Sequence, residues 1–215
     1  MNTAFRFAFL AVLLIFQGCK KDHPVTARLV LQPGPEAGQD AILSRVVPDR
    51  NQSLHPDLPL SAIFVEGELN INRVAILFDL SSISAKANVK KALLTLYFNP
   101  KSVYLASNGA TGHYPENAFQ IQRITAPWKE TIITWNNQPA TSSELQVLVP
   151  AATSPTQNYT VDVTDLVREM VRNPAANYGF LLKHQNETPY RITFLASSDH
   201  PDAELRPKLE VEYEN

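Results

Sequence analysis

Alternation of apolar and polar residues is the feature that most constrains what this chain can fold into. The closing segment, KLEVEYEN, is the clearest case: one face carries Leu209, Val211 and Tyr213, and the other face carries Glu210, Glu212 and Glu214. Because successive side chains of a strand point to opposite faces, this period of two predicts a strand with one buried side. The row of glutamates also resists edge-to-edge pairing with another chain.

The same period recurs along most of the 215 residues. Further strands are predicted in RVAILFDL, ALLTLYFNP, AFQIQRIT, NYTVDV, YGFLLKH and YRITFLAS, the last with Tyr190 on its apolar face. One short helix is predicted in TDLVREMVRNP, with Thr164 as N-cap and an end before Pro174. A long polar loop with three prolines, VPDRNQSLHPDLPLS, is the main irregular segment. Many short strands with a single small helix predict an all-β sandwich in one domain.

The first residues have the character of an export signal and not of a folded segment. Arg6 is followed by an apolar run from Phe7 to Phe16, which is too short to span a bilayer as a helix. The sole cysteine, Cys19, follows Gly18, and the segment resembles a bacterial lipoprotein signal, although Phe16 stands where such signals usually carry Leu. An ordinary buried thiol is the alternative for Cys19.

This resemblance implies a lipidated protein, attached by Cys19 to the bacterial outer membrane. We therefore expect a signal peptide over residues 1–18, a lipidated tether over 19–27 and a folded domain over 28–215. The short charged tract after Cys19, KKD, is compatible with exposure at the cell surface and equally with a solvated tether. A single cysteine excludes an intrachain disulfide.

Charge and motifs exclude several functions. Without Arg6 the chain has 18 basic and 21 acidic side chains, so nucleic acid is not an expected partner. The five histidines include no His-x-x-x-His pair for zinc, and no Gly-x-Ser-x-Gly nucleophile motif occurs. No particular pair of acids is singled out for glycoside hydrolysis.

The scattered carboxylates are compatible with a calcium site. Asp40, Asp79 and Asp162 lie in or beside predicted strands, and each is a candidate Ca²⁺ ligand or, alternatively, a local capping group. The segment SSDHPDAE, residues 197–204, is a candidate for cation binding or for a catalytic acid, although its composition is that of an ordinary loop. The ligands of such a metal site are not assigned by the sequence.

Five segments, in order, carry a family resemblance. They are GQDAILSR, FDLSSISAKANVKKALLTLYF, RITAPWKETIITWNNQPA, VDVTDLVREMV followed by NYGFLLK, and RPKLEVEY. From about Leu29 to Tyr213 the chain resembles the DNRLRE family, the disaggregatase-related modules grouped as carbohydrate-binding module family 96. The resemblance implies a jelly-roll-like β-sandwich that binds glycans, some of them acidic polymers such as alginate. The proline-rich loop and the lack of an attached catalytic domain depart from the family pattern.

Candidate ligand-binding residues are cations and rings. Arg123, Lys183 and Arg191 would form a basic strip for an acidic glycan if their strands were neighbours. Tyr104 and Tyr114 lie in a long stretch without apolar periodicity, where they either meet a ligand or anchor the loop.

The two tryptophans, Trp128 and Trp135, would point to opposite faces of an extended chain, so we expect both to be structural, with Trp135 in the core.

Three functions remain open at this stage. The first is a lipid-anchored, non-catalytic polysaccharide-binding protein that serves neighbouring glycan-degrading or import proteins of the envelope. The second is a structural or adhesive lipoprotein that binds a protein partner. The third is a polysaccharide lyase or hydrolase.

Overall fold

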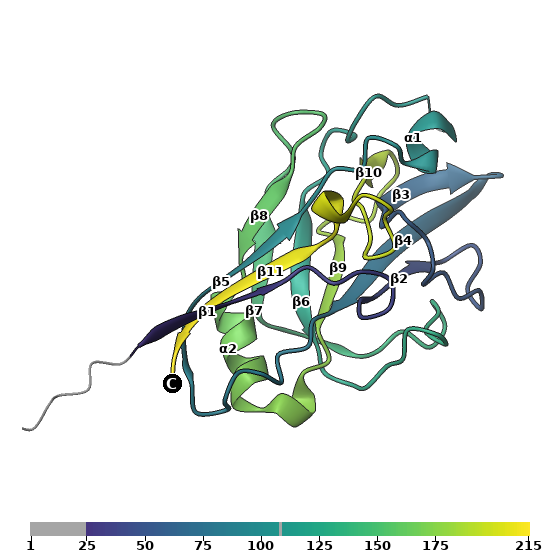
Figure 1. Cartoon of the computed structure of the whole chain (residues 1–215). Coiled ribbons are helices and arrows are strands. Elements are labelled where there is room, and N and C mark those ends of the chain that lie inside the picture. The colour runs from purple at the N-terminus through teal and green to yellow at the C-terminus, as the bar shows by residue number, and fades with distance from the viewer. Residues whose placement is uncertain (1–24, 108) are drawn as a thin grey trace, which may run out of the picture.

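The computed structural model describes residues 25–107 and 109–215 (Figure 1). The expected signal peptide, Cys19 and most of the expected tether lie outside these residues. The first strand, β1, already begins at Thr26, two residues before the expected start of the domain. Within this part of the chain, no helix combines the length and the apolar character needed to cross a bilayer.

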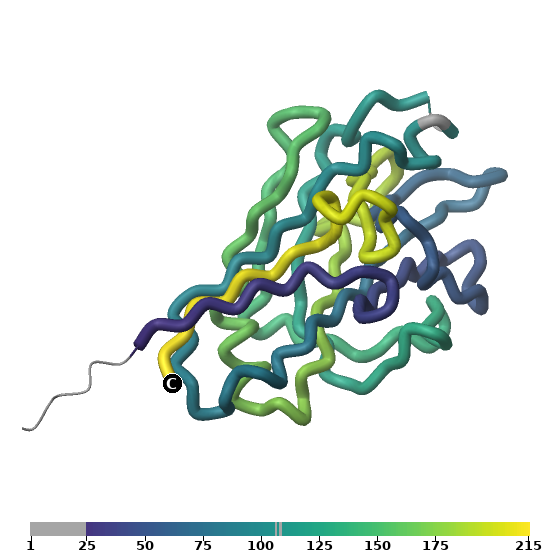
Figure 2. Tube along the Cα trace, in the orientation of Figure 1, coloured from purple at the N-terminus to yellow at the C-terminus, as the bar shows by residue number. Residues whose placement is uncertain are grey.

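Two antiparallel sheets form the molecule. The first sheet has the order β1 (Thr26–Leu31), β11 (Lys208–Glu214), β5 (Asn88–Leu96) and β8 (Tyr159–Asp162). The second has the order β10 (Arg191–Thr193), β3 (Leu60–Val65), β4 (Glu68–Leu77), β9 (Phe180–His184), β6 (Phe119–Ile124) and β7 (Thr141–Val149), and β2 (Gln39–Ser44) also pairs with β4. Figure 2 shows how β1, β11 and β5, from distant parts of the chain, run side by side.

The main core lies between the sheets and follows the predicted alternation. Leu94 and Leu96 of β5 meet Val74 of β4 and Phe180 and Leu182 of β9 in one buried cluster. Each of these side chains is fully shielded from solvent. The expected all-β sandwich is therefore confirmed, and the period of two selects the residues that fill it.

Helix α2 (Thr164–Arg172) closes one end of the sandwich with its apolar stripe, which carries the residues expected there. The predicted N-cap is wrong by one position, because Val163 holds the cap and Thr164 is already helical. Instead, the Asp162 carboxylate accepts hydrogen bonds from the Thr164 N–H (2.9 Å) and hydroxyl (2.5 Å). Three shorter helical turns were not predicted: α1 (Val103–Ser107), η1 (Pro174–Ala176) and η2 (Ala203–Leu205).

Residues 125–140, here called the tryptophan loop, form a loop and not the extended stretch assumed from the sequence. The loop covers the outer face of the second sheet, where Leu181 lies with Ala41, Ala75 and Ile133 in a second buried cluster. Trp128, Trp135 and Tyr178 pack against that cluster. The loop therefore adds a third layer to the sandwich and brings both tryptophans to one side of the sheet.

Candidate functional site

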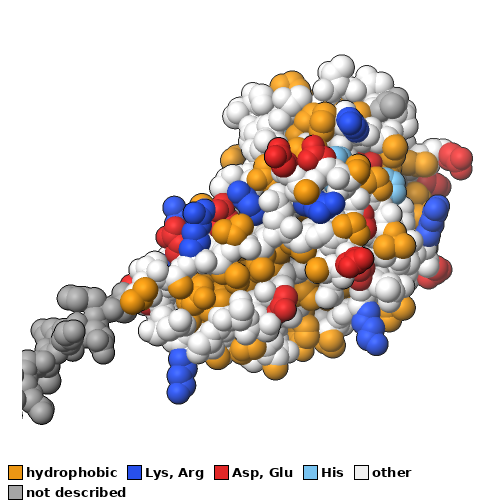
Figure 3. Space-filling view, in the orientation of Figure 1, with side chains coloured by type: hydrophobic (Ala, Val, Ile, Leu, Met, Phe, Trp, Pro, Cys, Tyr) orange, Lys and Arg blue, Asp and Glu red, His pale blue; other side chains and the backbone are white. Residues whose placement is uncertain are grey.

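A cleft of about 740 Å³ lies where the tryptophan loop meets the end of α2. Its walls are the turn at residues 36–39, the end of β4 with residues 77–81, the loop residues 128–131, and four residues at and after the end of α2. Figure 3 shows hydrophobic side chains gathered over the middle of this face of the molecule. Segments far apart in sequence therefore build one hollow with apolar walls.

Trp128 is the aromatic side chain that gives the cleft a flat wall. The indole N–H donates to the Tyr178 carbonyl at 2.8 Å, and the ring is only partly buried against the second cluster. The hydrogen bond and the packing fix the orientation of the ring, while part of its surface faces the cleft. A fixed, partly exposed ring offers an apolar face to the C–H groups of a sugar ring at little cost in conformational entropy.

The charged groups around the ring are mainly acidic. Glu36, Asp79 and Glu130 line the cleft together with Lys129 and Gln39. Asp79 is exposed, and hydrogen bonds from the Ser81 side chain and from the Ser81 N–H, the latter at 2.9 Å, lower the pKa of that acid below its usual value. These hydrogen bonds are the local capping role that was the alternative to Ca²⁺ binding. An ionised, anchored carboxylate of this kind can accept hydrogen bonds from sugar hydroxyls.

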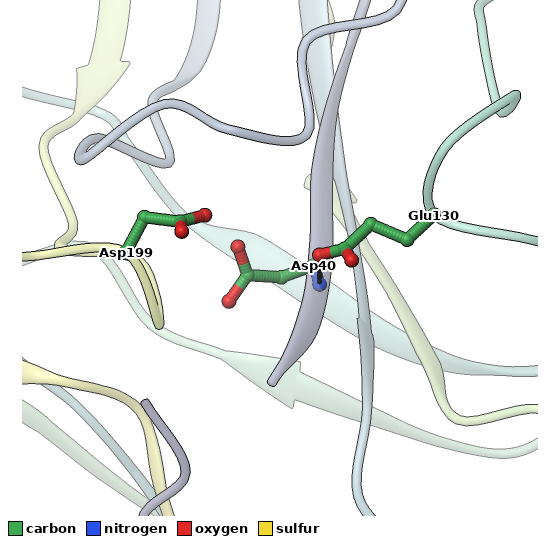
Figure 4. A group of neighbouring side chains, drawn as sticks. All are labelled: Asp40, Glu130 and Asp199. Atoms are coloured by element: carbon green, nitrogen blue, oxygen red, sulfur yellow. Dashed lines mark hydrogen bonds between the residues drawn. The ribbon is translucent and has the colours of Figure 1, made fainter. Parts of the chain in front are cut away.

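Glu130 also belongs to a group of three acids behind the cleft wall, here called the carboxylate cluster: Asp40, Glu130 and Asp199. One carboxylate oxygen from each lies within 4.8 Å of the others (Figure 4). Asp40 is only 1% exposed, and the pKa of its carboxyl is raised to about 7, first by burial and then by repulsion from Asp199 and Glu130. Burial also raises the pKa of Glu130 and that of Asp199.

The three predicted cations do not form a basic strip. β6 and β9 are neighbours, but Arg123 lies opposite Phe180 while Lys183 lies opposite Gln120. Gln120, the partner of Lys183, is three residues from Arg123 on β6. Because this number is odd, Lys183 and Arg123 face opposite sides of the sheet. Arg191 is on β10, which pairs with β3, and its guanidinium binds Glu116 and the Thr188 carbonyl.

Tyr104 and Tyr114 lie in a third cluster that packs around Phe194 and Leu105. The Tyr104 ring is 5.5 Å from that of His55, and the Tyr114 ring is 6.4 Å from that of Phe194. Neither tyrosine lines the cleft beside Trp128. The structure thus places both as packing groups of this cluster, and a role in ligand binding stays a prediction.

The expected core position of Trp135 is met only in part, because its side chain is partly buried and packs at the edge of the second cluster. The Arg73 guanidinium is 4.7 Å from the ring centroid, and it also forms two hydrogen bonds of 2.7 and 2.8 Å with the Glu187 carboxylate. A guanidinium stacked on an indole shields the ring while remaining hydrated. Trp135 therefore has a structural position outside the cleft.

Two exposed rings were not anticipated from the sequence. Tyr190 is 68% exposed and Phe64 is 52% exposed, and their rings meet edge to face at 6.3 Å. The prediction that Tyr190 shares the buried face of its strand is wrong, because β10 begins only at Arg191 and Tyr190 has a positive φ of 67°. This pair is a second aromatic surface on the described part of the molecule.

A sandwich with a fixed aromatic ring in an open cleft has the architecture of a ligand-binding module. The sequence model of carbohydrate-binding module family 96 matches residues 63–213, well over half of the chain. The chain belongs to this family, and carbohydrate is therefore its class of ligand. Comparison with curated proteins gives no match. Trp128, Glu130 and Asp199 lie within the matched residues, whereas Asp40 precedes them.

Proposed function

We propose that the chain is a lipid-anchored, non-catalytic polysaccharide-binding protein of the bacterial outer membrane, exposed at the cell surface. It would retain a glycan chain for envelope proteins that degrade or import it. Family membership supports the ligand class. The position of Trp128 in the wall of the cleft is the observation that supports this binding site over other surfaces.

The chemistry of the cleft suits a sugar better than a purely apolar ligand. The Trp128 ring offers one flat apolar face, and Asp79, Gln39 and Lys129 offer acceptors and donors at the rim. Sugar rings have apolar C–H faces bordered by hydroxyl groups, and they therefore match a wall of this mixed character.

The charged residues that line the cleft favour one class of polysaccharide over another. Three acids and one lysine line the cleft, so a neutral glycan meets less repulsion there than an alginate-like polyanion. An acidic glycan would need the cations of other surfaces, such as Lys183 on the outer face of β9, or a bridging metal ion. We accordingly propose that neutral polysaccharides bind in the cleft and that acidic ones bind more weakly.

The lipid anchor rests on the first residues, where an apolar run leads to Cys19. Cysteine carrying several acyl chains would bind the membrane firmly, whereas a single chain gives only marginal attachment. Thr26 pairs with Glu214, so the folded domain would be held by the end that carries the C-terminus. The tryptophan loop, which forms one wall of the cleft, lies away from that end of the domain (Figure 1).

Affinity electrophoresis against neutral and acidic polysaccharides tests the proposal. We expect neutral polymers to retard the protein, and Trp128→Ala to abolish the retardation while Tyr190→Ala leaves it unchanged. If Tyr190→Ala abolishes binding instead, the site lies at the Phe64–Tyr190 surface. Trp128→Phe keeps most of the packing, and its circular dichroism and melting temperature separate lost binding from lost folding.

The two alternative functions predict other outcomes of the same experiments. An enzyme would release reducing ends or unsaturated products from the retained polymer. However, the most strongly perturbed acid, Asp40, is fully buried and cannot reach a polymer. A structural or adhesive lipoprotein would show no retardation by any glycan and would retain a protein partner through purification.

A further inference from the structure

The carboxylate cluster brings together three segments that are distant in sequence. Asp40 is the second residue of β2, Glu130 belongs to the tryptophan loop, and Asp199 lies in the turn between β10 and β11. Figure 4 shows the Asp40 carboxylate between the other two, facing that of Asp199. Three carboxylates repel one another, so folding alone gives no reason to gather them at one point.

Asp40 supplies an observation that is independent of this clustering. Its Oδ2 accepts the Ser198 N–H at 2.8 Å, but its Oδ1 is completely buried and has no hydrogen-bond partner. The buried Ser198 hydroxyl next to it also has no hydrogen bond of normal geometry, although its closeness to the carboxyl lowers the pKa of Asp40 and so opposes the effect of burial. A buried carboxylate oxygen without a donor is costly, and such groups in native proteins are normally paired or bound to a metal.

Protein cations do not provide the missing charge. In the described part of the chain, none of the three carboxylates forms an ion pair. Burial raises the pKa of Asp199, and the charge of Arg206 opposes this rise only in part, because the Arg206 Nε donates instead to the His200 carbonyl at 2.9 Å. The most buried acid of the cluster, Asp40, therefore has no protein cation beside it.

We propose that Asp40, Glu130 and Asp199 bind a Ca²⁺ ion. Calcium takes six to eight oxygen ligands at about 2.3–2.6 Å, so oxygens on opposite sides of one ion are up to roughly 4.8 Å apart. The three carboxylate oxygens satisfy this limit without any movement of the backbone. Mg²⁺ fits less well, because it demands octahedral geometry at about 2.0–2.1 Å and holds its waters more tightly.

The ion would fix the tryptophan loop to the rest of the fold. The Asp40 N–H already donates to Glu130 Oε1 at 3.1 Å, and Gly38, Gln39 and Glu130 all line the cleft. Calcium would add a second link, from Glu130 through the ion to Asp199, and so hold Trp128 in position. This coupling between ion and glycan rests on the proposed function, whereas binding of the ion itself does not.

Calorimetry and thermal unfolding of the full chain in detergent, after dialysis against EDTA, test the site with CaCl₂ and MgCl₂ as probes. We expect one Ca²⁺ to bind and to raise the melting temperature by about 5–10 °C at one hundred times Kd, with a smaller shift for Mg²⁺. Glu130→Gln keeps the acceptor for the Asp40 N–H and should weaken binding about tenfold or more. Glu68→Gln, at an exposed position of β4, is the matched control and should leave binding unchanged.

The variant Asp40→Asn tests whether a lost response to Ca²⁺ merely reflects loss of folding. Its amide oxygen can still accept the Ser198 N–H, and the buried charge is removed. In EDTA the variant should melt at the wild-type temperature or above it, yet show no response to Ca²⁺. Absence of heat and of a thermal shift for the wild type at millimolar Ca²⁺, or equal shifts in all variants, would overturn the proposal.

Measuring glycan binding with and without Ca²⁺ separates the proposed metal site from the proposed function. Wild type should bind its glycan at least about tenfold more weakly in EDTA than in Ca²⁺, since the metal site supports the loop. Calcium binding with unchanged glycan affinity would contradict the coupling but leave the metal site in place. Calcium binding without any glycan binding would contradict the proposed function alone.

Discussion

At the scale of single residues, the two tryptophans differ in what holds them. The Trp128 ring is fixed by its hydrogen bond to the Tyr178 carbonyl and faces the cleft. The Trp135 ring is covered by Arg73, which is itself held by Glu187. One tryptophan therefore remains available to a ligand, while the other completes the outer layer of the second sheet.

His113 leads to a prediction about pH. Its ring is buried, with Nε2 2.9 Å from the Gln157 carbonyl and Nδ1 accepting the Phe194 N–H at 3.1 Å. Burial lowers the pKa of His113 below its usual value of 6.5. The folded state therefore binds a proton less readily than the unfolded state, so the contribution of His113 is complete above pH 6.5 and is lost as the pH falls below it.

We expect His113→Gln to lower the free energy of unfolding at pH 7.5 by about 1–3 kcal/mol, because buried partners lose their hydrogen bonds. Between pH 7.5 and 5 the variant should lose less stability than the wild type. Urea denaturation at several pH values measures this difference. The comparison is needed because Asp40, with its raised pKa, gives the opposite trend. Parallel curves for the two proteins would refute the assignment to His113.

At the scale of elements, the tryptophan loop is braced by the proline-rich loop that precedes β3. The Asn51 amide donates to the carbonyls of Glu130 at 2.7 Å and Ile133 at 2.8 Å, and its oxygen accepts the Ser53 hydroxyl. At a second point, the Asn136 amide donates to the exposed Asp49 carboxylate at 2.8 Å. Each loop thus supplies hydrogen-bond partners that the other lacks within its own backbone.

We expect Asn51→Ala to destabilise the protein by about 1–3 kcal/mol, because two carbonyls of the tryptophan loop lose their donor. The same change should weaken glycan binding, since Trp128 and Glu130 belong to that loop. Asn136→Ala is the control, and its exposed hydrogen bond should contribute about 0.5 kcal/mol or less. Equal losses of stability in the two variants would show that Asn51 does not brace the loop.

Several elements with one buried face were predictable from sequence, although β3, which buries Leu60 and Ala62, was not predicted. β5, β6 and β11 alternate because one side meets the core between the sheets. β7 was missed because only one of its residues, Val149, is buried, while Leu145 and Leu148 both face solvent. The tryptophan loop was wrongly predicted to be extended. Its apolar residues pack on the outer face of the second sheet, and the local sequence does not show that a sheet lies beneath them.

The candidate site, like the tryptophan loop, could not be predicted from local sequence patterns. Asp40 and the segment containing Asp199 were each considered as metal ligands, but only the paired strands bring them together with Glu130. The predicted basic strip is not formed, because the order of strands in a sheet cannot be derived from the local sequence pattern of each strand. Local periodicity predicts which residues are buried, whereas the meeting of distant segments requires the topology.

At the scale of the whole molecule, the ends of the chain and the cleft occupy different regions. β1 starts beside the end of β11, where Thr26 pairs with Glu214, and the tryptophan loop, which forms one wall of the cleft, lies on the other side of the view (Figure 1). A membrane attached through residues before Thr26 would lie at the end of the domain where β1 begins. The fold is compatible with a glycan chain that binds while the anchor is in the bilayer.

This separation makes a prediction about Cys19, which lies outside the described residues. In a host that attaches lipids to such cysteines, we expect Cys19→Ser to move the protein from the membrane fraction to the soluble fraction. Its glycan affinity should equal that of the wild type in detergent, because no group of the cleft depends on the anchor. Membrane fractionation, labelled palmitate incorporation and affinity electrophoresis measure the three quantities. A variant that stays in the membrane fraction would contradict the anchor, and a soluble variant without glycan binding would mean that the first residues take part in the site.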